Sequence, residues 1–216
     1  MKQTLSILLV LVGLTSPAAL FTASPNLTIP DGNPNGVSSS IAISDVGVNL
    51  TDVNVYLTVS GGYNGDFYAY LSFNGTTVVL MNRVGKTSGS AFGYTDSGLS
   101  NIKLDDAATT DIHLYGGALG GSPLTGSWQP DRRTTDPLLV TDASARGNSL
   151  AAYNDMSPNG NWTIFFADMA SGGSTATLQS WSLDLEPVPE PIETALIIFG
   201  VIVGGFAVGR RWFARA

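Results

Sequence analysis

The feature that most limits the fold of this chain is the alternation of apolar and polar residues along its middle part. Within 53–59 and 67–73 every second residue is apolar, the period of a strand whose side chains point to opposite faces of a sheet. The alternating apolar residues are Val53, Val55, Leu57, Val59, Phe67, Ala69, Leu71 and Phe73. Asn74-Gly75 separates the second segment from the apolar stretch 76–84, and this dipeptide favours a two-residue hairpin turn. These segments therefore predict β-strands, and the second and third of them are predicted to form a hairpin.

Later segments of the chain carry β-branched and aromatic residues between Gly, Ser and Asn. Four of them are predicted to be strands, at 101–104, 111–116, 161–168 and 176–186. Residues 25–186 show no long stretch with a period of 3.6, so short strands joined by turns predict an all-β antiparallel sandwich or barrel. Trp162 and Trp181 are expected in its core, with a surface for stacking ligands as the alternative.

The composition of residues 25–186 limits the classes of function open to them. The region is long enough for one domain with a substantial core. It contains fifteen acidic and six basic residues, a formal charge of −9, and it has no basic stripe, so nucleic acid is not an expected partner. The chain has no Cys, which excludes disulfides, thiolate nucleophiles and Cys-bound metals.

The C-terminal part of the chain predicts a membrane anchor. Residues 194–209 form an apolar run without a polar face, and a helix of this length measures roughly 24 Å, short of the roughly 30 Å hydrocarbon core. Arg210, Arg211 and Arg215 follow with Trp212 among them, as is typical of a cytoplasmic membrane boundary. We therefore expect a transmembrane helix at 194–209 and a basic cytoplasmic tail at 210–216. The alternative is a buried core helix.

The N-terminal part predicts export. Residues 1–18 contain one lysine, an apolar stretch and small residues near Ala18, the layout of a secretory signal peptide. Cleavage is expected between residues 18 and 24, with a mature chain that begins near Ala19. An uncleaved N-terminal anchor is the alternative. Both ends of the sequence thus place residues 25–186 outside the cytoplasm.

The segment that joins this body to the apolar run resembles a known sorting signal. Val188-Pro189-Glu190-Pro191, within a linker at 187–193, precedes the apolar run and the terminal arginines, and this order resembles the PEP-CTERM signal. The resemblance implies recognition by an exosortase, a peptidase of the inner membrane of a Gram-negative bacterium, and delivery to the cell surface or the extracellular matrix. The two prolines that flank Glu190 hold the backbone extended. The alternative to a sorting signal is therefore a stiff linker without a sorting role.

A second resemblance covers most of the body. Three segments, 27–44, 60–80 and 157–185, resemble the proprotein-convertase P-domain (P/Homo B) family. The resemblance rests on two motifs. One is a Gly-Asp step that opens a strand at Gly65-Asp66, and the other is a closing pair of strands that contain Trp162 and Trp181. The resemblance implies a jelly-roll-like β-sandwich, a fold that stabilises subtilisin-like proteases and recurs in secreted bacterial proteins. No protease domain precedes it in this sequence, which departs from the convertase pattern.

Carboxylates at strand ends are the candidate metal ligands of the chain. Asp66 follows Gly65, which is expected to permit a tight turn, and Asp168 ends a strand. Asp105 and Asp106 are candidate additional ligands for a Ca²⁺ ion, since an exported domain without Cys suits a hard, oxygen-bound cation. No Asp-x-Asp-x-Asp-Gly loop occurs. The alternative is that these carboxylates cap turns.

The sequence does not predict an enzyme. His113 is the single histidine, no Gly-x-Ser-x-Gly elbow occurs, and all three Glu residues lie in the tail, at Glu186, Glu190 and Glu193. A lone His within a strand is expected to be a packed or surface side chain, and a zinc site would have carboxylate partners only.

The expected function is that of a non-catalytic surface or matrix protein in a structural or adhesive role. The first alternative is a module that binds an extracellular polysaccharide, which an exposed, coplanar set of aromatic rings would favour, whereas burial of these rings would favour the structural role. The candidate rings are those of Tyr63, Tyr68, Tyr70, Phe92, Tyr94 and Trp128. A weaker alternative is an accessory domain for a separate secreted protease.

Overall fold

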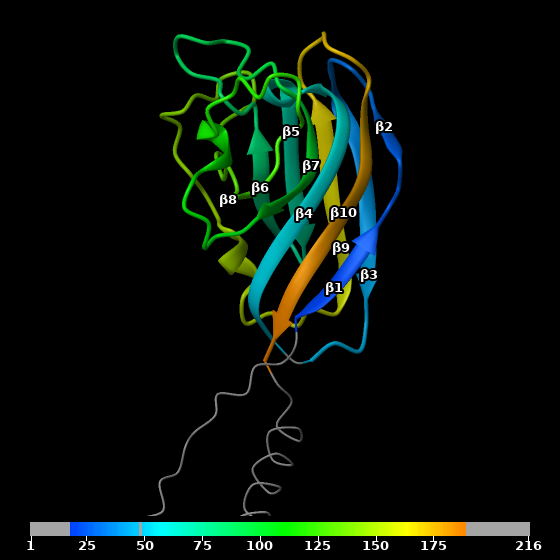
Figure 1. Ribbon diagram of the computed structural model, residues 1–216. Coiled ribbons are helices and arrows are strands. Elements are labelled where there is room, and N and C mark those ends of the chain that lie inside the picture. The colour runs from blue at the N-terminus through cyan, green and yellow to red at the C-terminus, as the bar shows by residue number, and fades with distance from the viewer. Residues whose placement is uncertain (1–17, 48, 189–216) are drawn as a thin grey trace, which may run out of the picture.

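The computed structural model describes residues 18–47 and 49–188, which form two facing β-sheets (Figure 1). The expected all-β sandwich is therefore confirmed. Several predicted features lie outside the described residues: the predicted signal peptide up to residue 17, most of the predicted sorting motif, the predicted membrane helix at 194–209 and the basic segment 210–216. Within 18–47 and 49–188, no helix is both long enough and apolar enough to cross a bilayer.

The first sheet has six strands and is built around the longest pair. In spatial order its path is β1 (Ala19–Ala23), β10 (Ala176–Pro187), β4 (Leu50–Tyr63), β7 (Ser97–Leu104) and β8 (Ser127–Trp128). A further strand, β2 (Leu27–Ile29), also pairs with β10, next to β1 along its length. All of these pairs are antiparallel except β7 with β8, which is short and parallel and departs from the expected antiparallel pattern.

The second sheet has four strands and carries the predicted hairpin. Its spatial order is β3 (Asn33–Ile43), β9 (Gly160–Asp168), β5 (Phe67–Phe73) and β6 (Thr76–Asn82). Asn74 and Gly75 join β5 to β6 with φ angles of 46° and 78°, the positive values that a two-residue turn between twisted strands requires. The hairpin is confirmed.

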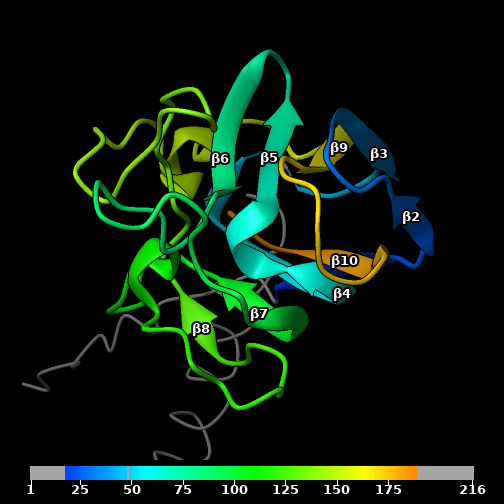
Figure 2. The ribbon, with the colours of Figure 1, turned by 90° about the horizontal axis from the view of Figure 1, so that it is seen from above.

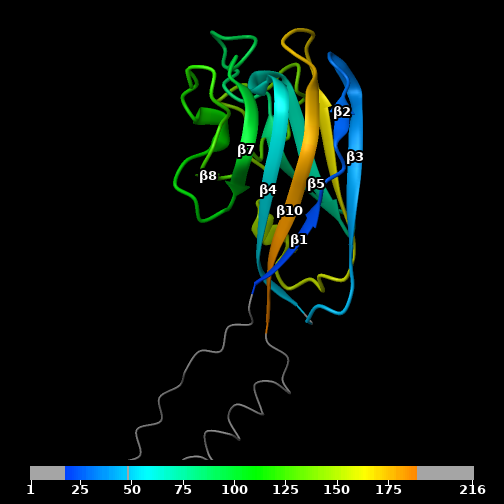
Figure 3. The same ribbon diagram turned by 45° about the vertical axis from the view of Figure 1, so that its right-hand side comes forward.

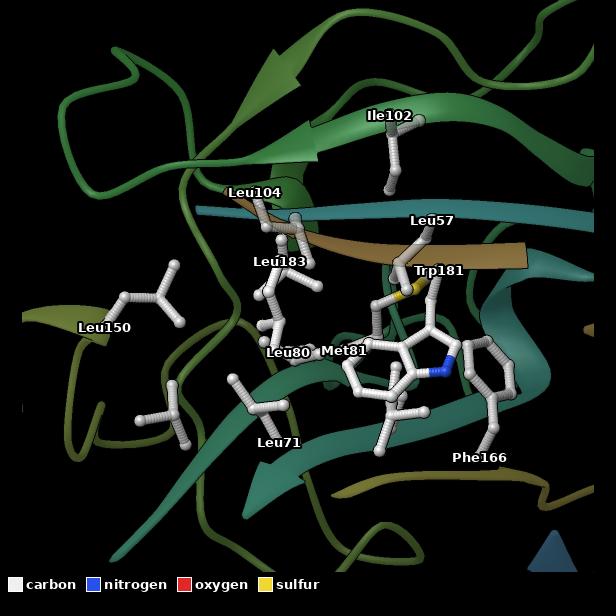
Figure 4. Close-up of a cluster of buried hydrophobic side chains, with 14 of the residues drawn as sticks. Leu57, Leu71, Leu80, Met81, Ile102, Leu104, Leu150, Phe166, Trp181 and Leu183 are labelled. Atoms are coloured by element: carbon white, nitrogen blue, oxygen red, sulfur yellow. The ribbon is translucent and has the colours of Figure 1, made fainter. Parts of the chain in front are cut away.

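The alternating apolar residues of both sheets meet in one core (Figure 4). In β5 the burial pattern alternates between buried and half-buried over its whole length, as the period of two predicts. Trp162 and Trp181 are at most 1% exposed, and each indole N–H finds an acceptor, the Pro158 carbonyl and the Ser39 hydroxyl, both at 2.9 Å. Burial of a large aromatic side chain contributes about 3 kcal/mol, so both tryptophans stabilise the sandwich, as expected.

Long connections between β6 and β9 cover one side of the sandwich (Figure 2). They contain two 3₁₀ helices, η2 (Ile112–Leu114) and η3 (Leu150–Tyr153), and a third, η1 (Asn64–Asp66), joins β4 to β5. The strand predicted at 111–116 is therefore wrong. Asp111 accepts a hydrogen bond from the His113 backbone N–H at 2.9 Å, and this local capping bond competes with an extended backbone.

The strands give the sandwich two distinct ends, which Figures 1 and 3 show. At one end, here called the terminal pole, β1 begins at Ala19, β4 begins at Leu50 and β10 ends at Pro187. At the other end, the loop pole, β4 leads through η1 into β5 and the turn between β9 and β10 lies nearby. The sandwich includes β1, so it starts before the expected domain boundary at residue 25.

Candidate functional site

Two of the four predicted metal ligands meet at the loop pole. Asp66 ends η1 and Asp168 ends β9, and β5 pairs with β9 so that Phe67 lies opposite Asp168. The Asp66 carbonyl accepts a hydrogen bond from the Met169 backbone N–H at 2.7 Å. The sheet register thus brings together two carboxylates that are about a hundred residues apart in sequence.

The other two lie at the far end of β7 and cap turns. Asp105 accepts hydrogen bonds from the Lys103 ammonium at 2.8 Å and the Ala107 backbone N–H at 2.7 Å. Asp106 accepts from the Ala151 backbone N–H at 2.8 Å. The structure therefore does not bring the four predicted Ca²⁺ ligands together. Within residues 18–47 and 49–188, no group of three His, Cys, Asp or Glu side chains is placed to bind one metal ion.

Asp66 is a buried carboxylate with one cationic partner. Its side chain lies 3.2 Å from the Arg83 guanidinium, both residues are 4% exposed, and Arg83 also donates to the Gly65 carbonyl at 2.6 Å. Burial raises the pKa of Asp66 to about 6; Arg83 opposes this shift, while Asp168 and Asp31 add to it. Burial also raises the pKa of Asp168. The group of three carboxylates and one arginine leaves this part of the loop pole negative.

Asp66 forms part of the wall of a cavity of about 200 Å³. The cavity lies where η1, the connection from β6 to β7 and the turn from β9 to β10 meet. Its lining residues are Tyr63, Asp66, Phe92, Tyr94, Thr95, Ala170 and Ser171. No sequence motif points to Thr95, Ala170 or Ser171, because they come from two connections that only the fold brings together.

Gly65 shapes this cavity by close packing of the backbone. A Cβ atom at Gly65 would lie 2.5 Å from both the Phe92 carbonyl oxygen and the Tyr94 backbone nitrogen. The Gly65 N–H donates to the Tyr94 carbonyl at 2.8 Å. Its φ is not among the positive values, so the expected special turn conformation is wrong, and the requirement for glycine comes from the neighbouring segment.

The six candidate aromatic residues do not share one platform. Tyr68 and Tyr70 lie on the outer face of the second sheet, where Tyr70 stacks on Phe165 with ring centroids 4.9 Å apart. Tyr94, Tyr115 and Trp128 pack against one another beside the core. Tyr63 and Phe92 are exposed, at 37% and 74%, and both line the cavity. The exposed aromatic surface is therefore concentrated next to Asp66.

A second charged group, which the sequence did not reveal, lies within the long connections. His113 is fully buried; its Nδ1 lies 2.8 Å from an Asp131 carboxylate oxygen, and its Nε2 lies 2.9 Å from the Lys86 carbonyl oxygen. Because a carbonyl oxygen accepts only, Nε2 donates to Lys86. Both ring nitrogens are thus occupied by structural partners, and neither is free to take a proton from a nucleophile.

Arg133 extends this group and links several loops. Its guanidinium lies 2.8 Å from Asp111, 3.0 Å from Asp131 and 2.9 Å from the Asp142 carbonyl oxygen. Arg146 adds a bond of 2.7 Å to the Pro130 carbonyl. Buried charges with many hydrogen-bond partners fix the geometry of the segments that carry them. The arrangement holds the connections in place.

The predicted sorting motif falls within the described residues only at Val188. Val188 is 38% exposed, and its backbone N–H donates to the Asn49 carbonyl at 2.7 Å, directly after β10 ends. Pro189, Glu190 and Pro191 lie outside the described residues, as do Arg210, Arg211 and Arg215. The chain thus leaves the sandwich at the terminal pole, on the opposite side from the cavity.

Comparison with known proteins shows only distant similarity. No protein-family model matches the sequence, and no curated protein matches it. The crystal structure of a serine protease of Aeromonas sobria is 15% identical, with a TM-score of 0.42, and the similarity covers 80% of this chain and 28% of that one. The complex of the Aeromonas sobria serine protease with a chaperone gives 17% identity, a TM-score of 0.41 and coverage of 81% and 28%. This chain thus spans little more than a quarter of either matched chain.

Proposed function

We propose that this chain is a non-catalytic protein of the cell surface or extracellular matrix of a Gram-negative bacterium. Its signal peptide directs export, and the motif at Val188–Pro191 is the substrate of an exosortase-type peptidase. The helix at 194–209 holds the precursor in the inner membrane, with Arg210, Arg211 and Arg215 on the cytoplasmic side. The sandwich, jelly-roll-like as the P/Homo B resemblance implies, acts in a structural or adhesive role.

The observation that supports this proposal is the position of the chain ends on the sandwich. β1 pairs with the final part of β10, so that Ala19 lies opposite Leu185 at the terminal pole. A tether that follows Val188 would therefore hold the terminal pole toward the membrane. The loop pole, with its exposed rings and its cavity, would face away from the bilayer, where a partner can reach it.

The intact mass of the protein isolated from its natural host tests this proposal. We expect a chain that begins near Ala19 and lacks about the last 27 residues, because export removes the leader and sorting cuts near Glu190. Replacement of Glu190 by Ala should leave the uncut precursor in the inner-membrane fraction. A full-length chain in the soluble cytoplasmic fraction would contradict both export and sorting.

Binding of an extracellular polysaccharide is the second candidate function. It is favoured by the two exposed rings at the loop pole, Tyr63 and Phe92, since aromatic faces of this kind stack on the apolar faces of sugar rings. Screening the purified full chain against a glycan array, with Phe92→Ala as the comparison, tests this function. Equal signals for both proteins on every glycan would exclude the cavity as the binding surface.

A further inference from the structure

We propose that the cavity at the loop pole binds a sugar that carries a positively charged amine, as part of a polysaccharide with free amino groups. The proposal rests on the second candidate function for its ligand class, and it does not depend on sorting or on the membrane anchor. It joins three properties of the cavity wall: exposed aromatic rings, a buried carboxylate and free hydroxyl groups.

The aromatic rings supply a surface for the body of the ligand. Phe92 is 74% exposed although it lines the cavity. The exposed ring of Tyr63 lies against the turn that contains Gly173, because a Cβ atom built on Gly173 would lie 3.2 Å from this ring. Tyr94 is held from behind, since a Cβ at Gly85 would lie 2.5 Å from its ring. Aromatic faces attract the C–H groups of sugar rings and also attract cations.

The carboxylate supplies the charge that selects an amine. Asp66 is 4% exposed and lines the cavity; Arg83 holds only one of its oxygens, and in the described part of the chain Oδ2 has no hydrogen-bond partner. The charges of Asp168 and Asp31 act on Asp66 as well, and among the described residues Arg83 is the cation that opposes their effect on its pKa. An ammonium group beside Asp66 would regain the interactions that burial removed from this carboxylate.

The remaining wall favours a sugar over a lysine side chain. The side chains of Thr95 and Ser171 are exposed at the cavity, and within residues 18–47 and 49–188 neither hydroxyl makes a hydrogen bond to the protein. Sugar hydroxyls can bond to both of them, whereas the methylene chain of lysine cannot. A cavity of about 200 Å³ is small for a ligand pocket, which suits one ring of a longer polymer.

Calorimetry with the purified full chain, kept in a mild detergent, tests the proposal. The probe is the tetrasaccharide of β-1,4-linked glucosamine; its fully N-acetylated counterpart and a tetralysine peptide are the comparisons. We expect the free-amine sugar to bind about tenfold or more tightly than the acetylated one, because acetylation removes the charge. It should also bind more tightly than the peptide.

Two variants locate the site. Asp66→Asn should weaken binding of the free-amine sugar by about tenfold or more and leave the acetylated sugar unaffected. Phe92→Ala, at a side chain that is 74% exposed, should weaken binding of both sugars. The matched controls are Asp45→Asn, an exposed carboxylate near the terminal pole, and Leu139→Ala, an apolar side chain that is 73% exposed; both should bind as the unmodified chain does.

The dependence on pH gives a further readout. Because the pKa of Asp66 is raised to about 6, with Arg83, Asp168 and Asp31 as its charged neighbours, its carboxylate is largely lost at about pH 5. Binding of the free-amine sugar should then be about tenfold weaker than at about pH 7, although the ligand itself gains protons over this interval.

Several outcomes would overturn the proposal. Equal affinity for the free-amine and acetylated sugars would remove the role of charge, and tighter binding of tetralysine would make this a peptide site. Unchanged binding in Phe92→Ala, or no binding of any probe, would remove the cavity as the site. These binding measurements do not involve the C-terminal tail. They can therefore contradict the sugar site while the intact mass still supports sorting, and the intact mass can contradict sorting while the sugar still binds.

Discussion

At the scale of single residues, the two core tryptophans are buried by the strands that carry them, whereas the environment of Asp66 is made by residues from other segments. Trp162 and Trp181 are recognisable as core residues because apolar positions alternate around them, and both are buried. The strand ends at Asp66 and Asp168 were also visible, but their proximity depends on the pairing of β5 with β9. The role of Arg83 depends on a contact to Gly65 that no local pattern encodes.

The buried carboxyl of Asp66 should make stability fall as the pH rises. Its pKa is about 6 in the folded protein against an ordinary value of 3.8, so the unfolded chain releases this proton first. The contribution of Asp66 is therefore fully present below about pH 4 and is lost between about pH 4 and pH 6. Relative to Asp66→Asn, the free energy of unfolding of the unmodified chain should fall by about 1–3 kcal/mol over this interval.

Urea denaturation at several pH values between about 3.5 and 7 measures this difference. Asp45→Asn is the control, since its exposed side chain should give a curve parallel to that of the unmodified chain. If the curves for Asp66→Asn and the unmodified chain are also parallel, the shifted pKa does not exist in solution.

At the scale of elements, the strands with a clear alternation were predictable, and the others were not. β5 and its hairpin with β6 follow from the apolar period and from Asn74-Gly75. No sequence pattern predicts β1, since its five residues are too few to show a period. The 3₁₀ helix η2 replaces a predicted strand because Asp111 caps it through a side-chain hydrogen bond.

Removal of β1 should destabilise the sandwich. β1 pairs with β10 along its whole length, Phe21 and Ala23 pack partly against the core, and Thr22 shares a hydrogen bond of 2.8 Å with Ser182. A chain that begins at Ser24 should lose about 2–4 kcal/mol of unfolding free energy relative to one that begins at Ala19.

Thermal and urea unfolding of the two chains measure this loss, with Phe21→Ala in the longer chain as an intermediate case. We expect Phe21→Ala to lose about 1–2 kcal/mol, the share that comes from its half-buried ring. Equal stability of the two chains would mean that β1 contributes nothing and that cleavage anywhere between residues 18 and 24 is structurally neutral.

At the scale of the whole molecule, the sandwich separates a pole where the chain leaves from a pole that carries the cavity. The strand order that produces this arrangement joins β1 to β10 and β3 to β9, pairs that are more than a hundred residues apart. The sequence predicts the two-sheet class from its short strands, but it contains no local signal for which strands become neighbours. The two poles could therefore not be predicted.

Fluorescence quenching should show the orientation of the sandwich on a membrane. The chain has no Cys, so single variants Ser44→Cys near the terminal pole and Gly89→Cys in an exposed loop near the other pole can be labelled selectively. β10 has 12 residues, which corresponds to about 40 Å along the sandwich. With the full chain in lipid nanodiscs that contain a quencher lipid, the label at residue 44 should be quenched strongly and the label at residue 89 little. Equal quenching would contradict an upright sandwich.

The position of β10 also bears on how the protein would respond to mechanical load. This strand runs from the side of the loop pole to Pro187, close to Val188, which the proposed tether would follow, and it has β4 on one side and β1 with β2 on the other. If a polymer pulls on the cavity while the tether is held, the tension runs along β10 and loads its hydrogen bonds in shear. Bonds loaded in parallel must break together, whereas bonds at a peeling edge break one at a time. With the proposed tether and a bound polymer, a strand paired on both sides would let the sandwich carry such a load.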